Sequence, residues 1–187
     1  RQPIPPKTIN KIQLACESIN DELRWMVALI SDTGMRLGEA AGLKASDVII
    51  DCAHPYLIIQ PNSCRRLKTK QSERKIPLVG YSLWAAKKSI QACESEYLFQ
   101  SYNKTGVCNA NSASAALNKW LKLHVEKDVV IHSFRHSIRD RLRNVECPSD
   151  IIDSIGGWSK RSIGESYGSG YQLPILHKWM NKITDPG

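Results

Sequence analysis

The sequence lacks any segment suited to crossing a membrane. No stretch approaches the roughly 20 apolar residues that a spanning helix needs, and no basic run followed by an apolar one opens the chain as a secretion signal. Internal repeats are absent, as are low-complexity tracts beyond a short proline-rich start. We therefore expect an intracellular protein, cytoplasmic in its host, without a membrane span.

Sequence patterns for metal ions and disulfides are equally scarce. No Cys-x-x-Cys pair occurs, and no carboxylate cluster stands out for a two-metal site. These gaps disfavour zinc domains and metal-dependent nucleases or transposases, and we expect no metal. The cysteines are too scattered for a disulfide framework and are expected to be reduced thiols: Cys16, Cys52, Cys64, Cys93, Cys108 and Cys147.

What the sequence has in excess is positive charge. Its 26 Lys and Arg residues outnumber 18 Asp and Glu, which gives a net charge of +8 and a pI near 9.2. Such an excess favours a polyanionic partner, and charge alone does not choose among DNA, RNA and an anionic membrane surface.

The length fits one ordinary domain. A chain of 187 residues, 42% of them hydrophobic, can bury a substantial core. Residues 1–7 are proline-rich and polar, as interdomain linkers are. We therefore assign residues 8–187 to the domain, treat 1–7 as a linker remnant, and expect the chain to be a fragment of a longer protein.

Hydrophobic periodicity predicts an α+β fold that is mostly α with a small antiparallel sheet. Residues 56–60 and 74–78 favour strands, joined as a hairpin with a basic tip at 62–73. Helices are expected as a pair between Thr8 and Ile30, a short one ending near Gly42, and others at 82–93, 112–124, 132–144 and 148–155. A terminal amphipathic helix would place on one face Ile175, Leu176, Trp179, Met180 and Ile183.

Arg36 and Arg135 are candidate phosphate ligands. Neutralising the non-bridging oxygens of a phosphodiester calls for bidentate donors that stay protonated, as arginine does. His132 lies three residues before Arg135, one turn back on the same face of a predicted helix, so both can reach one phosphate. Glu39, three residues after Arg36, is placed to orient that arginine or a neighbouring histidine, or else it faces solvent.

Tyr167 is the candidate nucleophile, nine residues after Trp158. A tyrosine that attacks a phosphodiester keeps the phosphoryl group on the protein and conserves the bond energy, which suits breaking and rejoining DNA. Because a tyrosine has an ordinary pKa near 10, it needs positive charge nearby, which the arginines and the histidine supply. Tyr171 and Tyr81 remain rivals, since no local feature excludes them.

The basic hairpin tip supplies a candidate general acid for the leaving 5′-oxygen. Lys68 is our choice, and Lys70 is a close rival. A basic run of this kind is also typical of an arm that contacts DNA phosphates. The residues that we expect to bind DNA in this way are Arg65, Arg66, Lys70 and Arg74.

In this order and spacing, the motifs resemble the catalytic domain of the tyrosine recombinases, the phage-integrase family, from about Thr8 to Ile183. Thr33-Gly34-Met35-Arg36-Leu37-Gly38-Glu39 resembles the family's first-arginine box. Lys68-Thr69, ahead of Ile76-Pro77-Leu78, resembles its hairpin lysine, and His132-Ser133-Phe134-Arg135-His136 its second box. Gly157-Trp158 resembles a Gly-His element, with tryptophan where most members have histidine.

The resemblance implies a catalytic set, with Glu39 as the supporting acid: Arg36, Lys68, His132, Arg135, Trp158 and Tyr167. It places the nucleophile at Tyr167 and implies a 3′-phosphotyrosine intermediate with a free 5′-hydroxyl, formed without metal or nucleotide cofactor. Indole N–H donation by Trp158 replaces a titratable group there. It also implies that an N-terminal core-binding domain is missing from this chain.

The function predicted on this basis is site-specific integration or excision of phage or mobile-element DNA, on the nucleoid of a bacterial host. Partners would be double-stranded DNA at attachment sites, a homotetramer joined through the C-terminal helix, and a DNA-bending accessory protein. Two alternatives stay open: relaxation of DNA as in type IB topoisomerases, and a catalytically silent DNA-binding module.

Overall fold

The computed structural model describes residues 2–63, 65, 72–104, 106–124, 129–158 and 170–184. Within them the fold is mostly helical with a small antiparallel sheet, which confirms the predicted class. The helices are α1 (Pro6–Ile19), α2 (Glu22–Thr33), α3 (Leu37–Ala41), α4 (Gly80–Gln91), α5 (Ala110–Leu121), α6 (Ser133–Asn144), α7 (Ser149–Gly156) and α8 (Leu173–Lys182), with 3-10 turns η1 (Ala45–Asp47) and η3 (Gln100–Tyr102).

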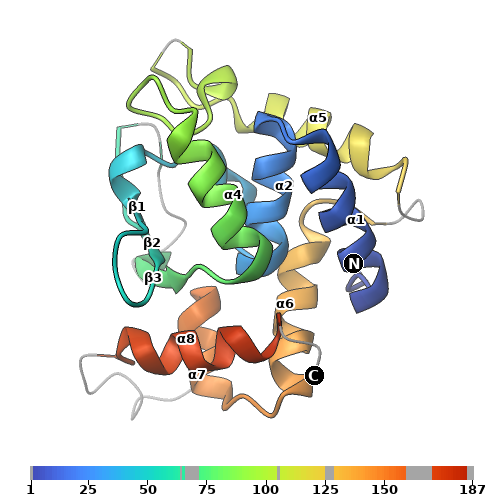
Figure 1. The fold of residues 1–187 in the computed structure, drawn as a ribbon, viewed down its shortest axis with the longest axis vertical. Coiled ribbons are helices and arrows are strands. Elements are labelled where there is room, and N and C mark those ends of the chain that lie inside the picture. The colour runs from blue at the N-terminus through green and yellow to red at the C-terminus, as the bar shows by residue number, and fades with distance from the viewer. Residues whose placement is uncertain are drawn as a thin grey trace.

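Helix α2 lies at the centre of the fold, in contact with α1, α4 and α6 (Figure 1). Its residues 26–33 are all buried, because neighbours cover it on several sides. Asp21 caps its start by accepting the backbone N–H of Arg24 at 3.0 Å. It ends at Gly34, whose φ of +61° is favourable for glycine, and a Cβ there would lie 2.2 Å from Cγ2 of Ile138.

The amino-terminal boundary differs from the expected one. Helix α1 starts at Pro6 and not at Thr8, because proline is well suited to the first helical position, where no backbone N–H is needed. Ile4 is buried, and its N–H donates to Oγ of Ser137 at 2.7 Å. Within the segment expected to be a linker, Ile4 therefore packs on the domain, and Pro6 and Lys7 belong to α1.

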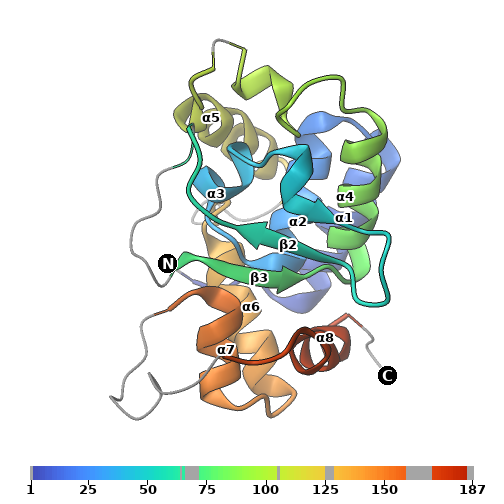
Figure 2. The ribbon, with the colours of Figure 1, turned by 90° about the vertical axis from the view of Figure 1, so that its left-hand side faces the viewer.

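The predicted hairpin is part of a three-stranded antiparallel sheet in the order β1-β2-β3. Strand β2 (Tyr56–Ile59) pairs with β3 (Arg74–Pro77), with Leu57 opposite Ile76. The extra strand β1 (Val48–Ile49) was not predicted, because two residues are too short for an alternating pattern. Strand β3 contacts α7 and α8, as Figure 2 shows.

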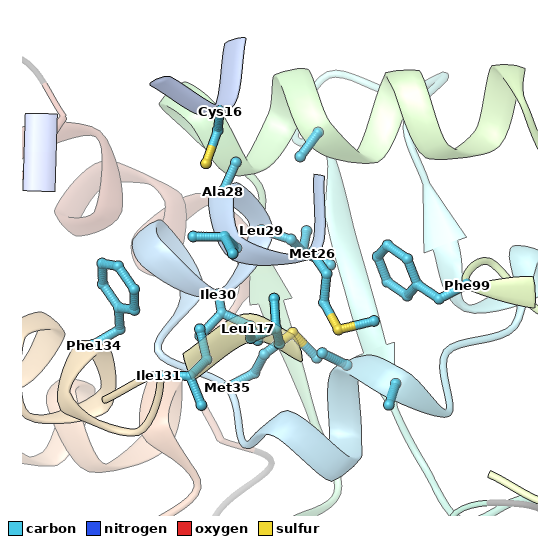
Figure 3. Packing of buried hydrophobic residues seen from close by; sticks show 14 of the residues in the cluster. Cys16, Met26, Ala28, Leu29, Ile30, Met35, Phe99, Leu117, Ile131 and Phe134 are labelled. Carbon is cyan, nitrogen blue, oxygen red and sulfur yellow. The ribbon is translucent and has the colours of Figure 1, made fainter. Parts of the chain in front are cut away.

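Apolar side chains form two clusters. The larger joins α1, α2, α5 and the start of α6, and it includes Phe99 and Phe134, which are both fully buried (Figure 3). Burying such a ring contributes roughly 1.5–3 kcal/mol, so Phe134 anchors the first turn of α6 and with it the neighbouring Arg135. The second cluster joins α6, α7 and α8.

Helix α8 packs onto its own chain through this second cluster. Leu176 and Met180 are buried, whereas Ile175 is 42% exposed, so its buried stripe is narrower than the predicted five-residue face. Contact of α8 with a neighbouring protomer remains a prediction.

None of the described helices is long and apolar enough to cross a membrane.

Candidate active site

Arg36 begins the site, between the end of α2 and the start of α3. The left-handed turn at Gly34 reverses the chain, and Arg36 then takes the N-cap position of α3 in an extended conformation. The Glu39 carboxylate accepts the backbone N–H of Arg36 at 2.8 Å and its Nη1 at 2.7 Å. Nη1 of Arg36 also donates to Oγ of Ser72 at 3.2 Å.

Glu39 binds a second arginine as well. Arg74, the first residue of β3, donates from Nη1 and Nη2 to the two Glu39 oxygens at 3.1 and 2.9 Å. Glu39 is buried, which by itself would raise its pKa, but the hydrogen bonds and charge of Arg74, together with Arg36, lower the pKa below its ordinary value. Glu39 is therefore a buried anion that orients two arginines.

Arg135 enters the site from the first turn of α6. It donates from Nη1 to the Gly34 carbonyl at 3.0 Å and from Nη2 to the Gly156 carbonyl at 2.6 Å. The two acceptors lie at the carboxyl ends of α2 and α7, where helix carbonyls lack intrahelical partners and carry partial negative charge. Nε of Arg74 donates to the preceding carbonyl of α7, that of Ile155, at 2.9 Å.

The three guanidinium groups of Arg36, Arg74 and Arg135, here called the arginine cluster, carry more charge than Glu39 neutralises. Burial first, and then the charges of Arg36 and Arg74, lower the pKa of Arg135 to about 9. Arg135 and Arg74 are almost fully enclosed, whereas the Arg36 side chain is 27% exposed. The cluster therefore has an excess of positive charge, which a bound anion would neutralise.

Trp158 covers one side of the cluster. Its ring centre lies 4.4 Å from Cζ of Arg135, within the range of a cation–π contact. Gly157, in the left-handed conformation, turns the chain out of α7, and a Cβ there would lie 2.9 Å from Nη1 of Arg74. The Gly157-Trp158 pair thus fits around two of the arginines because residue 157 has no side chain.

His132 stands at the amino-terminal end of α6, one turn before Arg135 on the same side of the helix. Its side chain is exposed, and its ring lies 5.4 Å from that of His136. The structure therefore brings five of the predicted residues into contact, with His132 one helical turn from Arg135: Arg36, Glu39, Arg74, Arg135 and Trp158.

Two arginines differ from the role expected of them. Arg65 is 2% exposed; it pairs with Asp47 at 2.9 Å and donates to the carbonyls of Gln60, Glu39 and Gly42. The guanidinium of Arg74 donates its hydrogen bonds to Glu39 and to the Ile155 carbonyl of α7. A guanidinium with buried internal partners is not an exposed contact for DNA, so we correct both assignments to structural support.

The comparisons with known proteins follow this geometry. The Phage integrase family model matches residues 3–171. The chain belongs to the phage integrase family. Its sequence is 28% identical over 157 residues to the prophage integrase IntF of Escherichia coli (strain K12), an alignment that covers 81% of this chain and 31% of that protein. The chain thus spans about a third of that relative's length.

Solved structures of similar fold include a recombinase and a transposon integrase, both bound to DNA. The XerH site-specific recombinase bound to palindromic difH substrate, in a post-cleavage complex, matches with a TM-score of 0.65 at 16% identity, covering 85% of this chain and 47% of that one. The Tn1549 transposon integrase in complex with circular intermediate DNA matches with a TM-score of 0.65 at 17% identity, covering 96% and 64%. At these identities the likeness shows the fold.

Several predicted residues of this integrase-family chain lie outside the described part of the structure. They are Arg66, Lys68, Lys70 and Tyr167. The two rival tyrosines are described. The Tyr81 hydroxyl donates to Glu17, and burial together with Glu17 raises the pKa of Tyr81. Both residues line a cavity of about 570 Å³ between α1 and α4, and no residue of the arginine cluster lines it.

The hydroxyl of Tyr171 donates to Asp150 in the first turn of α7. The arginines bind the opposite end of that helix, about 9 Å away for six residues of helical rise. Among the described residues, the hydroxyl of each rival donates to a carboxylate, Glu17 or Asp150, and neither hydroxyl bonds to an arginine of the cluster.

Sequence reasoning missed four contributors to the site. Ser72 and the glycine carbonyls of residues 34 and 156 contact the arginines through bonds between distant segments, and no local signal reveals these bonds. Arg139 is different, because it follows Arg135 by four residues and shares its helical face. That spacing could have singled it out.

Proposed function

We propose that this integrase-family domain is the catalytic centre of a site-specific recombinase that integrates or excises phage or mobile-element DNA. The observation that carries the proposal is the arginine cluster, where one buried carboxylate bonds to two guanidinium groups and a third lies within range of its charge. A phosphodiester supplies the missing negative charge, and the DNA-bound recombinases of similar fold support this choice of ligand.

Arg36 and Arg135 take the non-bridging oxygens of the scissile phosphate in this proposal. Arg36, the more exposed of the two, reaches the ligand from the start of α3, while the carbonyls of α2 and α7 fix Arg135 from behind. The two guanidinium groups stabilise most strongly the negative charge that builds up on the phosphate in the transition state, because they are already oriented before the reaction begins.

Tyr167 attacks the phosphorus, forms a 3′-phosphotyrosine and releases a 5′-hydroxyl. The positive field of the arginine cluster favours the phenolate, and Lys68 donates the proton to the leaving oxygen. His132 serves as an acid or base, and the indole N–H of Trp158 donates to a phosphate oxygen. A 5′-hydroxyl from a second strand reverses the step, and no metal takes part.

The test is a suicide substrate, a duplex with a nick beside the scissile phosphate so that the cleaved end is lost. Its sequence is the junction between the mobile element and its host, and the protein is the longest natural form that contains this chain. We expect wild type to form a covalent protein–DNA adduct in EDTA and Tyr167→Phe to form none. An adduct with the Phe variant, or loss of the wild-type adduct in EDTA, would contradict the proposal.

Assembly is part of the same proposal. We infer that four copies act on paired attachment sites and that α8 supplies the contact between them. Persistent relaxation of supercoiled DNA, with no recombination between paired sites, would point instead to a topoisomerase of type IB.

A further inference from the structure

Arg139 lies against the face of Trp158 at the edge of the arginine cluster. It follows Arg135 by one turn of α6, and its Cζ lies 5.0 Å from the centre of the indole ring, while Cζ of Arg135 lies 4.4 Å from it. We infer that Arg139 is a positioning residue that holds the Trp158 indole in the orientation that the reaction uses. This inference rests on the proposed function.

The orientation of the indole follows from its contact with α7. A Cβ built on Gly156 would lie 1.8 Å from Cζ3 and 1.9 Å from Cε3 of Trp158, so the benzene edge of the ring lies directly on that glycine. In an indole, Nε1 is on the side away from Cε3 and Cζ3. The single N–H donor of Trp158 is therefore directed away from Gly156.

Three contacts hold the ring in this pose. Gly156 supports the benzene edge, and the guanidinium groups of Arg135 and Arg139 both lie within cation–π range of the ring. The backbone of Trp158 is also fixed, because its N–H donates to the Asp153 carbonyl at 3.0 Å. Since an indole has only one N–H, its use as a donor depends on this orientation.

Arg139 is itself held in place. Its Nη2 pairs with Oδ1 of Asp153 on α7 at 3.3 Å, and Asp153 is 9% exposed. Its buried Nε finds no acceptor among the described residues, and the side chain as a whole is 32% exposed. Because Asp153 offsets its charge, we assign Arg139 to the indole of Trp158, and the test below distinguishes this role from direct contact with DNA.

The kinetic test compares Arg139→Ala in two backgrounds with the nicked junction duplex, at saturating protein. In wild type, the loss of one cation–π contact is expected to lower the rate of adduct formation roughly tenfold. Trp158→Phe keeps an aromatic ring and removes the N–H donor. In that background Arg139→Ala is expected to change the rate by less than about twofold. Arg139→Gln, which keeps a donor for Asp153, should behave like Arg139→Ala.

Arg143→Ala is the matched control. It removes the same charge from the same helix, but Arg143 is 58% exposed and pairs with Asp140, so its rate should equal that of wild type. An equal loss from Arg139→Ala in both backgrounds would overturn the inference, because Arg139 would then act on DNA or on the fold. No loss in wild type would overturn it too.

A spectroscopic measurement separates this inference from the proposed function. In protein labelled with 5-fluorotryptophan, the Trp158 resonance is the one that Trp158→Phe removes. We expect Arg139→Ala to shift or broaden it and Arg143→Ala to leave it unchanged. A wild type without adduct but with this response would refute the function and keep the positioning role; an unperturbed resonance in Arg139→Ala would refute the positioning role.

Discussion

Arg65 and Arg135 are both buried and both bond to backbone carbonyls, but the charge of Arg65 is neutralised inside the protein and that of Arg135 is not. Arg65 donates to three backbone carbonyls and to Asp47, which is itself buried, so its charge is neutralised inside the protein. Arg135 also donates to backbone carbonyls, but its charged neighbours include Arg36 and Arg74, and its pKa falls to about 9. Burial therefore does not distinguish a structural arginine from a functional one.

What distinguishes them is the carboxylate count. The Arg65 site has one carboxylate for one guanidinium and is complete without a ligand. The arginine cluster has one carboxylate for three guanidinium groups, at a cost to folding that an anion would offset. The same comparison explains why Arg65 is not an exposed contact for DNA, although it belongs to a basic run.

The largest effect on stability is expected from Arg65→Ala. It leaves Asp47 buried without its partner, which should lower the free energy of unfolding by about 3–5 kcal/mol. Urea unfolding of wild type and variant measures this. The double variant Arg65→Met, Asp47→Leu should recover part of the loss, because the uncompensated charge is gone while the carbonyls that Arg65 bonded still lack that donor. A single-variant loss below about 1 kcal/mol would show that the two sites are not as different as the structure indicates.

Within the arginine cluster, a large effect on catalysis is expected from Arg135→Lys. A lysine keeps the charge but cannot hold both glycine carbonyls and a phosphate in fixed directions. Adduct formation with the nicked junction duplex should slow by roughly 10²–10³, the scale of losing one oriented donor. If cleavage continues at the wild-type rate, the cluster does not stabilise the transition state.

A smaller effect is expected from inorganic phosphate. At ten times its dissociation constant, phosphate should stabilise the fold by about 1.4 kcal/mol, measured as a rise in melting temperature against chloride of equal ionic strength. Burial and the charges of Arg36 and Arg74 lower the pKa of Arg135 from the ordinary range of arginine to about 9. Because the anion binds the protonated form, its effect should fade as the pH rises through about 9. An equal response in Arg135→Gln would place the phosphate elsewhere.

The helices could be predicted from sequence because their signals are local. Apolar spacing sufficed for α8, with Leu176 and Met180 buried as expected, and Gly34 and Gly42 marked the ends of α2 and α3. The same holds for Glu39, which contacts Arg36 three residues away. Interactions within one turn of a helix leave a readable spacing.

The arginine roles could not be predicted because their partners are distant. Arg65 bonds to Asp47 across 18 residues, Arg74 to Glu39 across 35, and Arg74 to Ile155 across 81. Which basic residues of one run are buried depends on the tertiary fold, which the composition of that run does not encode. Exposure of Ile175 on α8 has a similar origin, since the second cluster covers only part of that helix.

The most direct test of the account is to identify the residue that carries the DNA. After the covalent adduct forms in EDTA, nuclease and trypsin leave peptide 162–178, which contains both Tyr167 and Tyr171. Fragmentation in a mass spectrometer should place the nucleotide remnant on Tyr167, in keeping with a nucleophile at the arginine cluster. A remnant on Tyr171, or on a serine of that peptide, would contradict the account.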